Sequence, residues 1–302
     1  MAERMRYEAV GFSMTGPYKR VVLDEQRFKD ISEARMVCLD AVAIEERFQL
    51  LLDNFKEWEI EFLSQSAHYL LWDETHEKAM DWRLALDRRL INLLSSCRLY
   101  HDQTSHIISR CFGNQSRELG QIEQFKHQLY DSSFEYRLLE ALRNYVQHCG
   151  LVLSSITFSD RSPSKTHRAV QVSATLNTKQ IERKDFKKAI FDELERAGEL
   201  DIRLPVRRYI SGLISIHAQI RKAIEDRVKD ARTMYVAAVD EFSSLSDPKG
   251  GLIWAEAVDS NDNGDIAFFF ITSFLSLYDD LFQRNSSAGD ISNLFVSNSG
   301  HD

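Results

Sequence analysis

The chain has 302 residues and a formal net charge of −8, so it lacks the generally basic character of most nucleic-acid-binding domains. Any contact with RNA would therefore have to be local. Only 12 glycines and 4 prolines occur, and 43% of the residues are hydrophobic, which points away from a turn-rich β fold and favours long helices in a globular protein.

The first half of the chain is predicted to be an extended segment followed by helices. Residues 1–24 contain glycine and proline turn signals and form the N-terminal extended segment. Apolar residues then recur at helical spacing, which predicts long helices over about 25–72, 84–108 and 122–148. Three long helices with short joins indicate an up-and-down helical bundle over residues 25–150.

The region 151–285 combines β-like and helical patterns. Residues 151–158 and 169–176 are rich in Val, Ile, Thr and Ser, and the polar segment 159–165 between them predicts the loop of a hairpin. A second hairpin is expected within 252–270. The predicted fold class is therefore mainly α, an up-and-down helical bundle with small β-hairpin additions.

Helical patterns return between the two hairpins. A helix is expected over 177–197, and a long apolar stripe follows in 206–242, with alternating three- and four-residue steps. Such a stripe suits packing against another long helix or against a partner chain. His217 interrupts it and is expected to be a core histidine bonded to a neighbour. The Ser/Asn/Gly-rich tail, residues 286–302, is predicted to be disordered.

The long helix within 206–242 and the residues just before it are locally basic. These side chains could form a stripe that tracks phosphates, and the acidic residues between them make a mixed solvated face the alternative. The basic residues are Arg203, Arg207, Arg208, Arg221, Lys222, Arg227, Lys229 and Arg232.

The run Arg143-Asn144-Tyr145-Val146-Gln147-His148 ends the third predicted helix and carries the chemistry. Metal-independent RNA cleavage needs a base for the ribose 2′-OH, a cation for the phosphate and an acid for the leaving oxygen. His148 suits the base or the acid, because the ordinary pKa of histidine lies near neutrality. Arg143 suits the phosphate, because its planar guanidinium can bind two oxygens. Asn144 lies one turn before His148 and can orient it.

The spacing places Arg143 and His148 about 140° apart on an ideal helix, at the two edges of one polar face. Glu140 lies on that face, and Asp102 on the second predicted helix could supply an acidic partner for Arg143 or His148. Both are further candidates for a supporting role. The competing interpretation is that this face is simply solvated and that the spacing arose by chance.

An arginine, a small polar residue and a histidine five positions after the arginine resemble the signature of the HEPN superfamily (higher eukaryotes and prokaryotes nucleotide-binding domains). The resemblance covers about residues 45–150 and makes 25–150 a HEPN-like bundle. It implies a small helical bundle, often dimeric, in which the motif helices of two protomers line one cleft. Some toxin members carry a tyrosine two residues after the histidine, which a partner nucleotidyltransferase modifies. Gly150 occupies that position here, which puts this route of regulation in doubt.

The predicted function is a metal-independent endoribonuclease with Arg143, His148 and Asn144 as catalytic residues, and the resemblance suggests a toxin or defence effector. Predicted partners are RNA, a second copy of the chain in a homodimer, and an antitoxin or activator protein. No cofactor and no metal site is predicted. The alternative is a non-catalytic helical interaction or scaffold protein that assembles through its long C-terminal helix.

A cytoplasmic location without membrane insertion is expected. The longest apolar run, residues 266–278, is too short to span a bilayer. The four cysteines show no CxxC spacing and are expected to be buried free thiols in a reducing compartment. They are Cys38, Cys97, Cys111 and Cys149.

Overall fold

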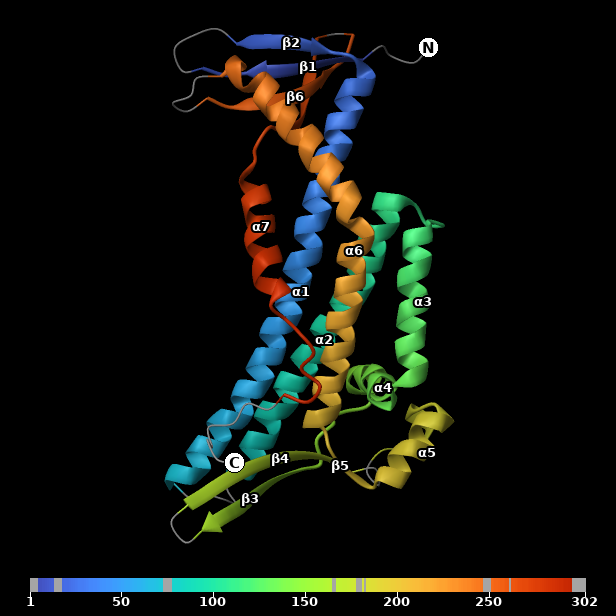
Figure 1. The fold of residues 1–302 in the computed structure, drawn as a ribbon, viewed down its shortest axis with the longest axis vertical. Helices are drawn as coiled ribbons and strands as arrows, with labels where there is room; N and C mark the ends of the chain where they lie inside the picture. Colours follow the sequence, from blue (N-terminus) through green and yellow to red (C-terminus); the bar gives the residue numbers. More distant parts are fainter. Residues whose placement is uncertain are drawn as a thin grey trace. The chain divides into compact units, whose positions relative to one another are not determined.

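The structure is a computed structural model that describes residues 5–13, 18–72, 78–164, 167–177, 181, 183–246, 251–260 and 262–294. As predicted, it is mainly α with small antiparallel sheets (Figure 1).

The chain divides into two compact units, which we call the first unit (Met1–Glu45 and Arg221–Arg284) and the second unit (Glu46–Ile220 and Asn285–Asp302). The chain passes between the units after residues 45, 220 and 284, because two long helices, α1 (Glu25–Trp72) and α6 (Arg203–Phe242), contribute residues to both units. The domain bounds predicted at residues 24, 150 and 285 stay a prediction.

The first unit contains an antiparallel sheet with the strand order β2-β1-β6-β7. This sheet contains the second predicted hairpin, which is confirmed as β6 and β7. The N-terminal segment is extended as predicted, but its pairing as β1 and β2 and its union with the hairpin were not predicted. The helix α7 (Ser273–Ser286) follows the sheet. The strands are β1 (Arg6–Gly11), β2 (Lys19–Leu23), β6 (Ile253–Val258) and β7 (Gly264–Phe269).

The two faces of this sheet have different chemistry. On one face Tyr7 stacks on Phe28 of α1, with ring centroids 4.4 Å apart. On the other face Glu8 and Glu256 are directly opposite each other on adjacent strands. The guanidinium of Arg20 donates to Glu8 at 2.7 Å and also to Glu256. Because both carboxylates are almost fully buried and share one arginine, this network favours a single register of β1 against β6.

The second unit is built on antiparallel helices. Contacts of α1 with α2 (Ala79–Phe112) pair Arg47 with Gln103 and Gln65 with the carbonyl of Trp82, so the two helices run in opposite directions. Contacts of α1 with α6 show the same opposite order (Figure 1). This part of the fold confirms the predicted up-and-down bundle.

The prediction of one continuous third helix over residues 122–148 is wrong. It is divided into α3 (Arg117–Ser132) and α4 (Phe134–His148), and Ser133 between them has an extended backbone. The hydroxyl of Ser133 accepts from the backbone N–H of Tyr136 at 3.1 Å, which caps α4 at its own start. Arg137 donates to the carbonyls of Tyr130 and Asp131 at the end of α3, at 3.0 and 2.9 Å. Backbone groups at the end of α3 and at the start of α4 thus have hydrogen-bond partners. The helix α4 runs across α3 rather than continuing it (Figure 1).

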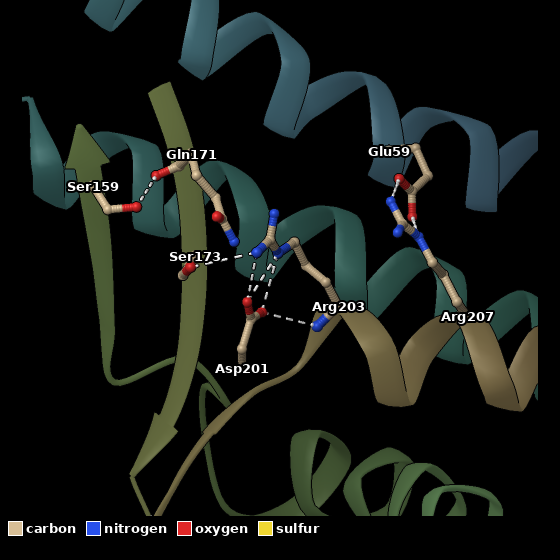
Figure 2. A network of polar contacts seen from close by, with 7 residues as sticks. All are labelled: Glu59, Ser159, Gln171, Ser173, Asp201, Arg203 and Arg207. Atoms are coloured by element: carbon tan, nitrogen blue, oxygen red, sulfur yellow. Dashed lines mark hydrogen bonds and ion pairs between the residues drawn. The ribbon is translucent and has the colours of Figure 1, made fainter. Parts of the chain in front are cut away.

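The first predicted hairpin is confirmed as β3 (Ser155–Ser164) and β4 (His167–Asn177), and β5 (Glu199–Asp201) adds a third strand. β3 continues through most of the segment that was expected to be a loop. Ser159 in that segment donates its hydroxyl to the carbonyl of Gln171 at 3.4 Å (Figure 2).

The helix expected over 177–197 is shorter than predicted. The described part is α5 (Lys188–Ala197), preceded by a single 3₁₀ turn at Arg183–Asp185. Residues 178–180 and 182 lie outside the described residues. In the tail, residues 295–302 lie outside them too, so the predicted disorder is not tested there. Among the described residues, no helix has the length and apolar character needed to cross a membrane.

The apolar stripe along α6 is confirmed and lies inside the protein. His217 in this stripe bonds to the hydroxyl of Tyr100 at 2.9 Å and stacks on Phe48 with ring centroids 3.7 Å apart, as a core histidine should. The buried stripe consists of Val206, Ile210, Leu213, His217, Ile220, Ile224, Val228, Ala231, Tyr235, Ala238 and Phe242.

The basic residues of α6 are largely engaged by carboxylates of the protein. Arg207 forms a two-point ion pair with Glu59 of α1, with bonds of 2.9 and 2.5 Å (Figure 2). Arg203 forms an ion pair with Asp201, two residues before it (Figure 2). Arg221 and Arg232 have acidic partners as well. These pairs fit the mixed-charge interpretation better than a stripe that tracks phosphates.

The buried pair of Arg207 and Glu59 should be costly to break. The two side chains are only 8% and 12% exposed, so Arg207→Leu leaves a buried carboxylate without its cation. We expect a loss of about 3–5 kcal/mol in the free energy of unfolding. The control is Arg232→Leu, whose partner Asp279 is half exposed, with an expected loss of about 0–1 kcal/mol. Urea unfolding measures both, and equal losses would contradict the expectation.

Candidate functional site

The predicted motif forms the last turns of α4, in the second unit. The helix ends where expected: the N–H of Cys149 bonds to the carbonyl of Tyr145 at 2.8 Å. Gly150 follows with φ of 156°, a backbone conformation that residues other than glycine rarely adopt.

The chain leaving the motif helix is anchored on α2. One carboxylate oxygen of Asp87 accepts from the backbone N–H groups of Val152 and Leu153, at 3.0 Å each. Arg83 donates to the carbonyl of Leu153 at 2.7 Å. Asp87 is 1% exposed, and burial raises the pKa of this carboxyl group. The end of α4 is therefore held by directional bonds to a neighbouring helix.

Arg143 is half-buried and bonded to a neutral group. Its Nη2 donates to Oδ1 of Asn144 at 2.6 Å, and its Nε is buried without a hydrogen-bond partner among the described residues. No carboxylate of the described residues forms an ion pair with it. By contrast, Arg137 on the same helix pairs with Glu193 at 2.9 Å. Arg143 therefore keeps a positive charge and N–H donors that an anion could take.

His148 and Asn144 are both exposed at the end of α4. We expected Asn144 to orient His148, but its side-chain oxygen accepts from Arg143 instead. Asp102 was a candidate partner for Arg143 or His148, and the structure pairs it with Arg98, one turn earlier on α2. Spacing of i and i+4 on one helix makes that pair the nearer one.

Glu140 is placed at the centre of a polar cluster, which we call the Glu140 cluster: Glu140, His101, Tyr136 and Tyr209. The hydroxyl of Tyr209 donates to Oε1 of Glu140 at 2.5 Å. Nε2 of His101 lies 3.7 Å from the same oxygen and 3.0 Å from the hydroxyl of Tyr136. Three helices meet in this cluster, since His101 belongs to α2, Tyr136 and Glu140 to α4, and Tyr209 to α6.

Sequence reasoning missed His101, Tyr136 and Tyr209. They lie far apart in the chain, and their types fit no motif spacing. The one local signal was the spacing of Tyr136, Glu140 and Arg143, which places all three on one side of α4.

The electrostatics of the cluster follow from burial and from nearby cations. Burial lowers the pKa of His101 to about 3, and the positive charges of Lys126, Arg98 and Arg143 act in the same direction. Burial also raises the pKa of the Tyr136 hydroxyl. His101 is therefore neutral near pH 7, and Arg143 is close enough for its charge to act on the His101 ring.

No group of three or more His, Cys, Asp or Glu among the described residues is arranged to hold a metal ion. Of the cysteines, Cys38 and Cys97 are buried as expected, and Cys111 is half-buried. The expectation is wrong for Cys149, which is exposed because it follows the last turn of α4.

Comparison of the chain with protein-family models, with curated proteins and with solved structures finds no match. The HEPN resemblance therefore rests on the residues of the sequence that carry the motif. Any function has to be argued from the chemistry of the site itself.

The neutral state of His101 predicts acid sensitivity. Its folded pKa of about 3 lies below the ordinary 6.5, so between these values the unfolded chain binds the proton more tightly. Stability is therefore lost as pH falls through that window, by about 2 kcal/mol from pH 7 to pH 5. In His101→Gln this contribution is absent, so the stability gap between wild type and variant should narrow at pH 5. Urea unfolding at both pH values measures it, and a constant gap would contradict the prediction.

Proposed function

We propose that the protein is a metal-independent endoribonuclease of the HEPN type, in which Arg143 binds the scissile phosphate and His148 transfers protons. One observation carries the proposal: the Arg143 guanidinium is half-buried, bonds to the neutral Asn144 amide and has no carboxylate partner in the described part of the chain. A guanidinium in that state can offer two N–H groups to phosphate oxygens.

The proposed reaction uses the substrate's own nucleophile. His148 takes the proton of the ribose 2′-OH, the 2′-oxygen bonds to phosphorus, and the bond from phosphorus to the 5′-oxygen breaks. The leaving oxygen receives a proton from a second histidine, and Arg143 stabilises the charge that builds on the phosphate. The products are a 2′,3′-cyclic phosphate and a 5′-hydroxyl.

A second copy of the chain supplies what one protomer lacks. Arg143 and His148 lie about 140° apart around α4, and the mechanism needs both a base and an acid. A two-fold homodimer would bring two copies of each residue to one cleft through an isologous contact. A toxin or defence role and an antitoxin or activator partner complete the proposal on the resemblance alone. A cytoplasmic location belongs to the proposal on the cysteine pattern of the sequence.

The scaffold alternative has less support. It needs the long helix α6 to offer an apolar surface, and the stripe that could do so is buried within the chain. No further observation favours this alternative.

Substitution of the motif separates catalysis from folding. We expect His148→Ala to lower the cleavage rate by about 10²–10⁴-fold, and Arg143→Ala by about 10²–10³-fold. Arg143→Lys should also fail, because one ammonium does not replace a two-point contact. Asn144→Ala should lower the cleavage rate less than these three substitutions do. Cleavage of a labelled RNA in a chelator measures the rates, and thermal melting should show changes within about 1 kcal/mol.

Matched controls are exposed residues on the neighbouring helices. His106→Ala on α2 and Arg117→Ala on α3 remove the same side-chain types and should leave cleavage unchanged. Unchanged cleavage in His148→Ala would show that the activity lies elsewhere or belongs to a contaminant. Activity that returns only with added magnesium or manganese would contradict the metal-independent mechanism.

The homodimer is tested by mass in solution. Light scattering at micromolar concentration should give about twice the mass of one chain, because the proposed cleft is incomplete in one protomer. A monomer that retains full activity would refute the composite cleft.

A further inference from the structure

The Glu140 cluster gives the motif helix a directional contact next to Arg143, in addition to the ion pairs of Arg137 with Glu193 and of Glu135 with Arg208. The other buried residues of α4 are Leu138, Leu139 and Leu142, whose contacts are apolar and do not specify one rotation of the helix closely. The hydrogen bond from Tyr209 to Glu140 is directional and is 2.5 Å long. This bond therefore restrains the rotation of α4 about its axis at the turn that carries Arg143.

Glu140 and Arg143 share one side of α4. They are three residues apart, so their side chains are neighbours on the helix surface. Tyr136 lies one turn before Glu140 on the same side, and its ring packs edge-on against Tyr209 with centroids 5.0 Å apart. A rotation of α4 that broke the bond to Tyr209 would move Arg143 with it.

We propose that Tyr209 is a positioning residue, which holds Glu140 and through it fixes where the Arg143 guanidinium points. The inference rests on the proposed function for its catalytic meaning, since Arg143 is assigned there to the phosphate. No residue of the Glu140 cluster is proposed to contact RNA. The buried cluster sets the direction of the guanidinium, and the exposed end of α4 carries the chemistry.

The test uses the full chain and changes one hydrogen-bonding side chain at a time. Tyr209→Phe deletes the hydroxyl donor and keeps the ring against Tyr136. Glu140→Gln keeps an oxygen that can accept from Tyr209, and Glu140→Ala removes it. The control is Tyr130→Phe, which removes a hydroxyl that accepts from Lys187 on the outside of the bundle.

Two readouts are measured on each variant. The first is kcat and KM for a short labelled RNA, at a temperature where circular dichroism shows every variant folded. The second is the ¹H–¹⁵N signal of the Arg143 Nε–H group, assigned by its loss in Arg143→Lys. This N–H is buried without a hydrogen-bond partner in the described residues, so its shift reports the placement of the guanidinium without any substrate.

Tyr209→Phe should lower kcat by about 10- to 100-fold with KM nearly unchanged, and should shift or broaden the Arg143 signal. Glu140→Gln should retain more activity than Glu140→Ala, and Tyr130→Phe should match wild type in both readouts. An unchanged signal and unchanged kcat in Tyr209→Phe would overturn the positioning role and leave the ribonuclease standing. A shifted signal in a protein whose wild type cleaves no RNA would support positioning and overturn the proposed function.

Discussion

The burial of one continuous apolar stripe along α6 is the constraint on which the rest of the structure depends. The stripe runs from Val206 to Phe242, so a single helix supplies core residues to both compact units. Burying such side chains contributes roughly 1.5–3 kcal/mol each, before the entropy of ordering the chain is counted. The polar groups on or beside this stripe are then forced to find partners inside the protein. His217 bonds to Tyr100, Arg207 to Glu59 and Tyr209 to Glu140.

The third of these partners links the core to the candidate site. Tyr209 lies on α6 but bonds to a residue of α4, one turn before Arg143. The break at Ser133 makes this possible, because α4 can take a direction of its own, apart from α3. Asp87 then fixes the chain after His148. Side chains of α6 and α2 thus hold the segment that carries Arg143 and His148 before and after the motif. Supporting a functional group on a rigid frame in this way is common.

The sequence predicts well where the physical signal is local. Helical spacing located α6 and α2, and segments rich in Val, Ile, Thr and Ser on either side of a polar segment located the first hairpin. The motif helix also ends at His148, where the sequence predicted. The break at Ser133 was missed, because the apolar spacing continues across it and the decisive hydrogen bonds come from a serine hydroxyl and from Arg137. The sheet that joins β1 to β6 depends on pairing between distant segments, which no local pattern contains.

The candidate site divides in the same way. The motif itself is read from adjacent residues, and the structure finds Arg143 without a carboxylate partner in the described residues. The surroundings of the motif are not local. Asp102 forms an ion pair with the nearer arginine on its own helix, and Glu140 accepts a hydrogen bond from Tyr209 on α6. Motif spacing therefore indicates which groups carry the chemistry, while tertiary packing decides which groups support them.

The most direct test of the central claim is a substrate in which one oxygen is missing. A short RNA that the protein cleaves at one position is compared with the same RNA carrying a 2′-deoxynucleotide at that position, and both are incubated with wild type in a chelator. If His148 activates the ribose hydroxyl against a phosphate held by Arg143, the deoxy substrate should bind but remain intact, and the cleaved RNA should end in a 2′,3′-cyclic phosphate. Equal cleavage of the two substrates would contradict the account.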